Sequence, residues 1–201
     1  MLLHEHTNHF TKLEYIIEFV NKLKLMKVTT NADFTVNDEP ILPVAAELND
    51  YQLVKTLIEL GADINATRKS KYSLGNTALI EASRYGNLDI VKLLVEKGAD
   101  INRTNYLGYS ALTYAVVNRH PDIVKYLLEH KALVDSVDKN NDTPLLIAIM
   151  KGYFEIVELL LSYGANIDHV DNDGENAFSL AYQGENYLII ELLHQYKIKS
   201  F

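Results

Sequence analysis

Histidines and carboxylates are the side chains in this sequence that could support catalysis or metal binding. His4, His6 and His9 lie within the polar residues 1–9, where imidazole nitrogens could ligate a metal ion. No carboxylate–histidine pair at helical spacing accompanies them, so a loosely docked terminus is favoured over a metal-binding tail. The remaining histidines occupy unrelated positions and are interpreted as surface or capping residues: His120, His130, His169 and His194.

The motifs of the common enzyme classes are absent from the sequence. The 201 residues include no cysteine, which excludes a thiol nucleophile, a disulfide framework and a cysteine-ligated metal. There is no Gly-x-Ser-x-Gly nucleophile elbow, no His-Glu-x-x-His zinc helix and no glycine-rich phosphate loop. We therefore expect no enzymatic activity, no cofactor and no bound metal.

The net charge of the chain argues against nucleic acids and anionic membranes as partners. The chain has 27 acidic and 19 basic residues, a formal net charge of −8, so its surface opposes the phosphates of nucleic acids and of anionic membranes. No apolar run reaches the roughly 18 residues of a membrane span, and the start MLLHEHTNHF lacks the features of a signal peptide. These features predict a cytoplasmic protein that binds neither nucleic acid nor membrane.

One stretch, Gly75 to Asn102, contains the elements from which the chain is built. Thr77 follows a Gly-Asn turn and can cap a short helix, because its hydroxyl can accept from a free backbone N–H of the first turn. Asn87 can cap a second helix, whose apolar residues between 90 and 95 form a single stripe. Gly98 suits the left-handed residue that ends this helix. A helix pair this short cannot bury its own apolar faces, so it needs neighbours.

The same unit recurs along the chain. Steps of 33 residues from Leu94 lead to Leu127, Leu160 and Leu193, and a step of 37 residues backwards leads to Leu57. A fixed period of this size is the signature of a stacked repeat array, in which each repeat contacts its neighbours and the whole forms one elongated domain. We expect a single domain over residues 1–201, divided into an N-terminal capping helix and connector (1–37) and five repeats at 38–66, 67–102, 103–135, 136–168 and 169–201.

Residues 11–27 form an amphipathic pattern ahead of the first repeat. Their apolar residues recur at helical spacing, which predicts a helix that covers the open apolar end of the stack. A helix lying on a membrane surface is the alternative, but acidic residues share its polar face.

The period and the motifs resemble those of ankyrin repeats. The resemblance rests on the Gly-x-Thr-Ala-Leu opening, the Asp-Ile-Val-Lys-Leu-Leu second helix and the Gly-Ala-Asp-Ile-Asn ending, and it covers about residues 38 to 197. It implies an all-α solenoid of stacked helix–turn–helix pairs with β-turn fingers. The histidine that usually follows Thr-Pro-Leu in this family is absent, so its hydrogen bond between neighbouring turns is not expected. The residues in its place are Pro43, Ile80, Thr113, Leu146 and Ser179.

The resemblance also implies a function: binding another protein on a concave surface made of the turn tips and the exposed side of the first helices. The family pattern places Asn76 and the following candidate partner-binding residues on that surface: Leu74, Arg84, Tyr85, Tyr106, Leu107, Tyr109, Asn118, Asp142, Lys151, Asp173 and Glu175.

The middle of this set is aromatic and its C-terminal part is acidic. The tyrosines offer rigid contact area of the kind that dominates binding hot spots, although they could instead pack along neighbouring turns and stiffen the array. The acidic group favours a partner with a basic segment. A basic cluster in the loop 66–74, Arg68, Lys69 and Lys71, is either a solvated loop tip or an anchor for an acidic partner segment.

Three functions are compatible with these features. The first is a monomeric adaptor or inhibitor that binds an unidentified partner protein. The second is a structural scaffold that self-assembles through the aromatic residues or the N-terminal helix. The third is a secreted effector that binds a host protein.

Overall fold

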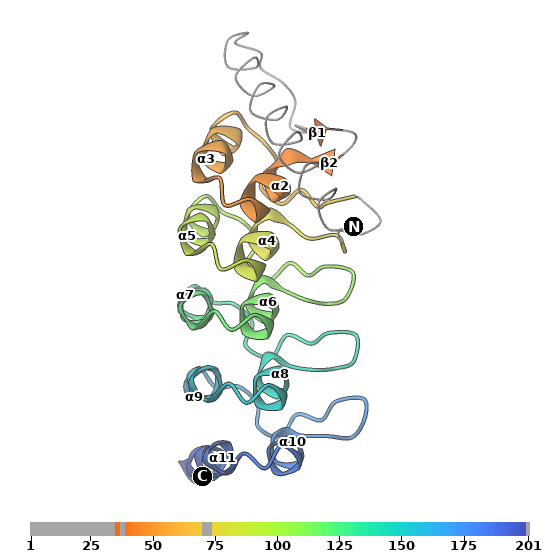
Figure 1. Ribbon diagram of the computed structural model, residues 1–201, viewed down its shortest axis with the longest axis vertical. Helices are drawn as coiled ribbons and strands as arrows, with labels where there is room; N and C mark the ends of the chain where they lie inside the picture. Colours follow the sequence, from red (N-terminus) through yellow and green to blue (C-terminus); the bar gives the residue numbers. More distant parts are fainter. Residues whose placement is uncertain (1–34, 37–38, 70–73, 200–201) are drawn as a thin grey trace, which may run out of the picture.

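The computed structural model describes residues 35–36, 39–69 and 74–199, and in this part the chain forms stacked pairs of antiparallel α-helices (Figure 1). The pairs lie in single file, with the inner helices along the middle of the stack and the outer helices along one side. This arrangement confirms the predicted all-α repeat solenoid. The inner helices are α2 (Ile41–Glu47), α4 (Ala78–Arg84), α6 (Ala111–Val117), α8 (Pro144–Met150) and α10 (Ala177–Gln183). The outer helices are α3 (Tyr51–Glu59), α5 (Leu88–Glu96), α7 (Pro121–Glu129), α9 (Phe154–Ser162) and α11 (Tyr187–Lys199).

Two short strands, β1 (Thr35–Val36) and β2 (Glu39–Pro40), pair in antiparallel fashion immediately before α2. They lie at the junction between the expected connector and the first repeat. The expected capping helix at 11–27 and the histidine-rich terminus fall outside the described residues. Among the helices that are described, none is long and apolar enough to cross a membrane.

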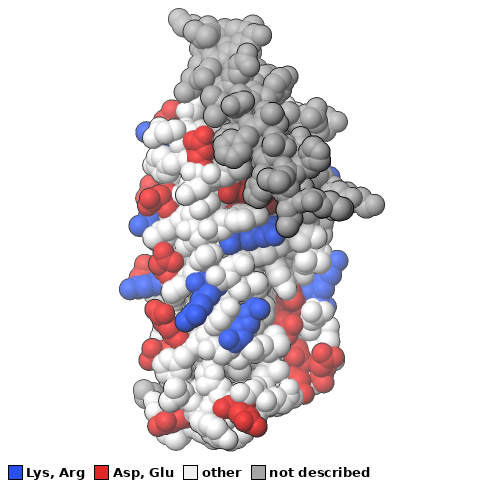
Figure 2. Space-filling model, in the orientation of Figure 1, with Lys and Arg blue, Asp and Glu red and all other residues white. Residues whose placement is uncertain are grey.

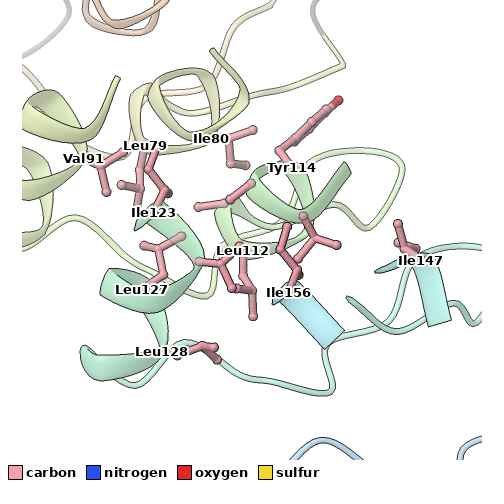
Figure 3. Packing of buried hydrophobic residues seen from close by; sticks show 14 of the residues in the cluster. Leu79, Ile80, Val91, Leu112, Tyr114, Ile123, Leu127, Leu128, Ile147 and Ile156 are labelled. Atoms are coloured by element: carbon pink, nitrogen blue, oxygen red, sulfur yellow. The ribbon is translucent and has the colours of Figure 1, made fainter. Parts of the chain in front are cut away.

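The core of the stack is the layer of apolar side chains between successive helix pairs. The leucines that share one place in the period, Leu57, Leu94, Leu127, Leu160 and Leu193, are all fully buried. Figure 3 shows Leu79 and Val91 of one pair beside Ile123 of the next. Each pair therefore buries its apolar faces against its neighbours, as the sequence pattern predicted.

The predicted cap of the inner helix α4 forms, whereas the predicted cap of the outer helix α5 does not. The Thr77 hydroxyl accepts a hydrogen bond from the Ile80 backbone N–H at 3.3 Å. Asn87 stands at the N-terminus of α5 but makes no capping bond. Its side-chain amide instead donates to the Ala46 carbonyl of the preceding repeat at 2.8 Å. Asn87 thus ties two repeats together.

The loops that enter α6, α8 and α10 project to one side of the stack as fingers, at residues 103–110, 136–143 and 169–176 (Figure 1). A side-chain oxygen closes each turn: Asp138 Oδ1 accepts from the backbone N–H groups of Asn140 at 2.8 Å and Asp142 at 2.9 Å. Asn105 and Asp171 make the equivalent bonds. These bonds fix the shape of each finger before any partner binds.

Hydrogen bonds between neighbouring fingers replace the threonine–histidine contact that this sequence lacks. The Tyr106 N–H donates to the Leu74 carbonyl at 2.8 Å, and the Lys139 N–H donates to the Leu107 carbonyl at 3.1 Å. A buried side-chain bond at 2.8 Å, from the Asn105 amide to Asn76 Oδ1, lies beneath the first of these. The fingers therefore form one connected edge.

Candidate functional site

The surface with the largest share of sequence candidates is the inner face, which we define as the fingers together with the C-terminal ends of the inner helices. Figure 2 shows positive charge in the middle of the stack, over the inner helices, mixed charge along the outer helices, and negative charge over the last fingers. The inner face thus carries apolar, acidic and basic groups in separate places.

Exposed apolar side chains occupy the N-terminal half of the inner face. Tyr106 is 64% exposed and Leu107 is 36% exposed at the tip of the 103–110 finger. Tyr85, at the end of α4, is also exposed, and its hydroxyl donates to Glu47 Oε1 at 3.2 Å. These three residues present apolar surface to solvent, although one face of the Tyr106 ring lies over Gly75, where an added Cβ would come within 2.8 Å of the ring.

Tyr109 behaves differently from its neighbours in the finger. Its ring is half-buried and meets the buried Tyr114 ring edge-on, with centroids 5.2 Å apart. The tyrosines were expected either to contact a partner or to pack along neighbouring turns, and different tyrosines suit each role. Tyr85 and the outer face of Tyr106 are available for contact, whereas Tyr109 packs on Tyr114 and the other face of Tyr106 packs over Gly75.

Three further candidates serve the scaffold. Leu74 is half-buried and gives its carbonyl to the next finger, and the exposed Asn118 bonds back to the Tyr114 carbonyl at 3.0 Å. The expectation for Asn76 is wrong: it is fully buried beneath the finger, because it accepts the bond from Asn105.

The acidic candidates gather on the last two fingers. Burial raises the pKa of Asp142 above the usual aspartate value, and the nearby carboxylates of Asp138 and Asp171 raise it further. Asp173 is exposed, whereas Glu175 is half-buried and accepts from the Gln183 amide at 2.7 Å. Across the described residues, no group of histidines and carboxylates is placed to hold a metal ion.

Three cations lie where the inner helices end. Arg84 is the last residue of α4, Arg119 follows α6 by two residues, and the exposed Lys151 caps the end of α8. Arg119 was not among the sequence candidates. It occupies a position that is glycine in the two adjacent repeats, Gly86 and Gly152, and this substitution is the signal that could have identified it.

Arg68, the first residue of the basic cluster in the 66–74 loop, is not a solvated loop tip. Arg68 Nη1 lies 2.5 Å from Glu47 Oε2 and 3.3 Å from Glu81 Oε1, and only 16% of the Arg68 side chain is exposed. Glu81 is itself buried within α4, and burial raises the pKa of its carboxyl, although the Asn76 amide and the Arg68 guanidinium oppose the rise. Arg68 is therefore an internal counter-ion rather than an anchor for a partner. Lys69 is exposed, and Lys71 lies outside the described residues.

Comparison with known proteins agrees with this geometry. A sequence model described as ankyrin repeats in three copies matches residues 42–138 and residues 130–200. A search of curated proteins gives no match to the chain.

Proposed function

Because the chain belongs to the ankyrin-repeat family, whose members are generally protein–protein interaction modules, we propose that it is a monomeric, non-enzymatic adaptor or inhibitor. It binds a partner protein on the inner face. The observation that supports this choice of surface is the exposure of Tyr106 and Leu107 at the tip of a finger. Apolar side chains in that position contribute nothing to the core, and a tyrosine offers rigid contact area at low entropic cost.

The fingers suit this role because they are held in shape before binding. Each turn is closed by its own side-chain bonds, and backbone bonds join each finger to the next. A surface that is already ordered loses little conformational entropy when a partner docks, so more of the contact energy appears as affinity. The acidic last fingers, with Asp142 and Asp173, favour a partner that brings basic residues to that end.

Tyr106→Ala is expected to weaken binding of the native partner by about tenfold or more, since truncating an aromatic anchor at a hot spot costs about 2 kcal/mol or more. Protein captured from the cells that make this chain is compared for the wild type and the variant. The melting temperature should fall by no more than a few degrees, because Tyr106 is largely exposed and only one face of its ring packs, over Gly75.

The matched control is Tyr163→Ala, which removes another exposed tyrosine at the end of the outer helix α9. Capture that survives Tyr106→Ala and is lost with Tyr163→Ala would move the binding surface to the outer helices and overturn the proposal.

A further inference from the structure

Three cations of the inner face come from three consecutive repeats, and together we call them the cationic strip: Arg84, Arg119 and Lys151. They come from the ends of α4, α6 and α8, and Figure 2 shows positive charge in the middle of this side of the stack. Packed helices lie about 8–10 Å apart, so the helix ends from which successive cations project are separated by roughly one layer of the stack.

Aromatic rings hold both arginines of the strip in place. The Arg84 guanidinium carbon lies 5.2 Å from the Tyr85 ring centroid and 5.6 Å from the Tyr114 ring centroid, and that of Arg119 lies 5.4 Å from the Tyr153 ring centroid. A ring that contacts a guanidinium leaves some of its N–H groups free to donate. These N–H groups match the two oxygens of a carboxylate, and positioning them in advance lowers the entropic cost of binding.

The charge of the strip is poorly neutralised within the protein. Neither Arg119 nor Lys151 forms an ion pair with any residue of 35–36, 39–69 or 74–199. Arg84 reaches Glu81 Oε2 only at 3.7 Å, and the other oxygen of Glu81 already contacts Arg68. A chain with a net charge of −8 therefore keeps a positive patch on the face where we propose that the partner binds.

The residues around the strip favour an acidic protein segment over a nucleic acid as its anionic ligand. A nucleic acid would bring a continuous run of phosphates past the acidic fingers that carry Asp138, Asp142 and Asp171, which would repel it. A protein segment can place carboxylates over the strip and other side chains over the fingers. Exposed apolar groups beside the strip, Tyr85 and Met150, also suit a protein segment.

We propose that the cationic strip binds carboxylates of the partner, so that the segment held on the inner face carries acidic residues beside its apolar anchor. This inference rests on the proposed function and specifies the chemistry of the partner. A segment in a polyproline II conformation advances about 9 Å in three residues, so acidic side chains at positions i and i+3 would meet successive cations.

The test is a selection of random peptides, displayed on phage, for binding to the wild-type protein. Peptides whose binding depends on Tyr106 are those bound on the inner face. We expect them to be enriched in Asp and Glu and to contain an aromatic residue. Their affinity, measured by fluorescence polarisation, should fall by about tenfold with Arg119→Glu and with Lys151→Glu, because each reversal replaces an attraction by a repulsion. The control is Lys125→Glu, the same reversal on the exposed outer side of α7, and it should change affinity by less than about twofold.

Two results would overturn the inference while leaving the proposed function intact. One is a set of peptides that depend on Tyr106 but are rich in Lys and Arg or insensitive to both reversals. The other is binding of a labelled random single-stranded RNA that is lost with Lys151→Glu, which would assign the strip to nucleic acid. If no selected peptide depends on Tyr106, the inner face itself is excluded and the proposed function fails with the inference. Circular dichroism of each variant confirms that a lost affinity is not a lost fold.

Discussion

Arg68→Ala is expected to lower the free energy of unfolding by about 3 kcal/mol at neutral pH, because removing one partner of a buried ion pair leaves uncompensated charge. The remaining charges are Glu47, at the end of α2, and Glu81, whose side chain is only 1% exposed within α4. Arg68 joins these two helices, so the first helix pair should be the part that loosens. Chemical denaturation gives the loss of stability, and hydrogen exchange over residues 41–59 locates it.

The loss of unfolding free energy caused by Arg68→Ala should depend on pH. The pKa of Glu81 is raised in the folded protein, so its ionisation destabilises the fold as the pH rises from the ordinary glutamate value towards the raised one. Without Arg68 this pKa rises further. The loss of unfolding free energy in Arg68→Ala should therefore be largest above the folded pKa of Glu81. It should shrink as the pH falls through that pKa.

Two variants make the test specific to the buried charges. Arg68→Ala combined with Glu81→Gln should recover at least half of the lost stability, because the buried charge is removed along with its counter-ion. Arg103→Ala, which truncates an exposed arginine that forms no ion pair with the described residues, should stay within about 0.5 kcal/mol of the wild type. If Arg68→Ala is no worse than Arg103→Ala, the network does not hold the first two repeats together.

Gly108→Ala is expected to destabilise the protein by about 2–3 kcal/mol, from backbone strain and from a clash between neighbouring fingers. Gly108 has a φ of 84°, and a Cβ there would lie 2.8 Å from the Asp138 Cα, which is backbone and cannot move aside cheaply. The matched control is Gly98→Ala: its φ is 87°, but a Cβ there meets nothing within 4 Å. The control should lose only the roughly 1 kcal/mol of a left-handed alanine.

Urea denaturation of the two glycine variants separates the strain from the clash. The excess loss of Gly108→Ala over Gly98→Ala measures how tightly the 103–110 and 136–143 fingers pack. Equal losses for the two variants would mean that the fingers do not constrain each other, and the rigid inner face would then lack its basis.

The fold was predictable from the sequence because its determinants are local and recur. A buried leucine at the same place in each copy, from Leu57 to Leu193, specifies the stacking, and Thr77 specifies where an inner helix begins. The left-handed ends of outer helices were also predictable. Gly98 adopts a φ of 87°, and Lys131, which stands at the glycine position of its repeat, adopts 68°.

The details of the site were less predictable because they depend on contacts between repeats. Arg68 looks like a surface residue in its loop, and its partners lie 21 residues before it and 13 residues after it. Tyr106 and Tyr109 stand in one turn, yet the Tyr109 ring packs on Tyr114, whereas the Tyr106 ring lies over Gly75 and stays largely exposed. Asn76 is buried for the same kind of reason, because its partner Asn105 belongs to the next finger.

The most direct test of the inner face as the binding surface is photo-cross-linking in the cells that make this protein. A photoreactive phenylalanine replaces Tyr106 on the finger in one variant and Tyr163 at the end of α9 in the other. Both sites are exposed, so both probes reach any protein that docks nearby. We predict a cross-linked partner from position 106 and none from position 163; a partner cross-linked from 163 alone would contradict the account.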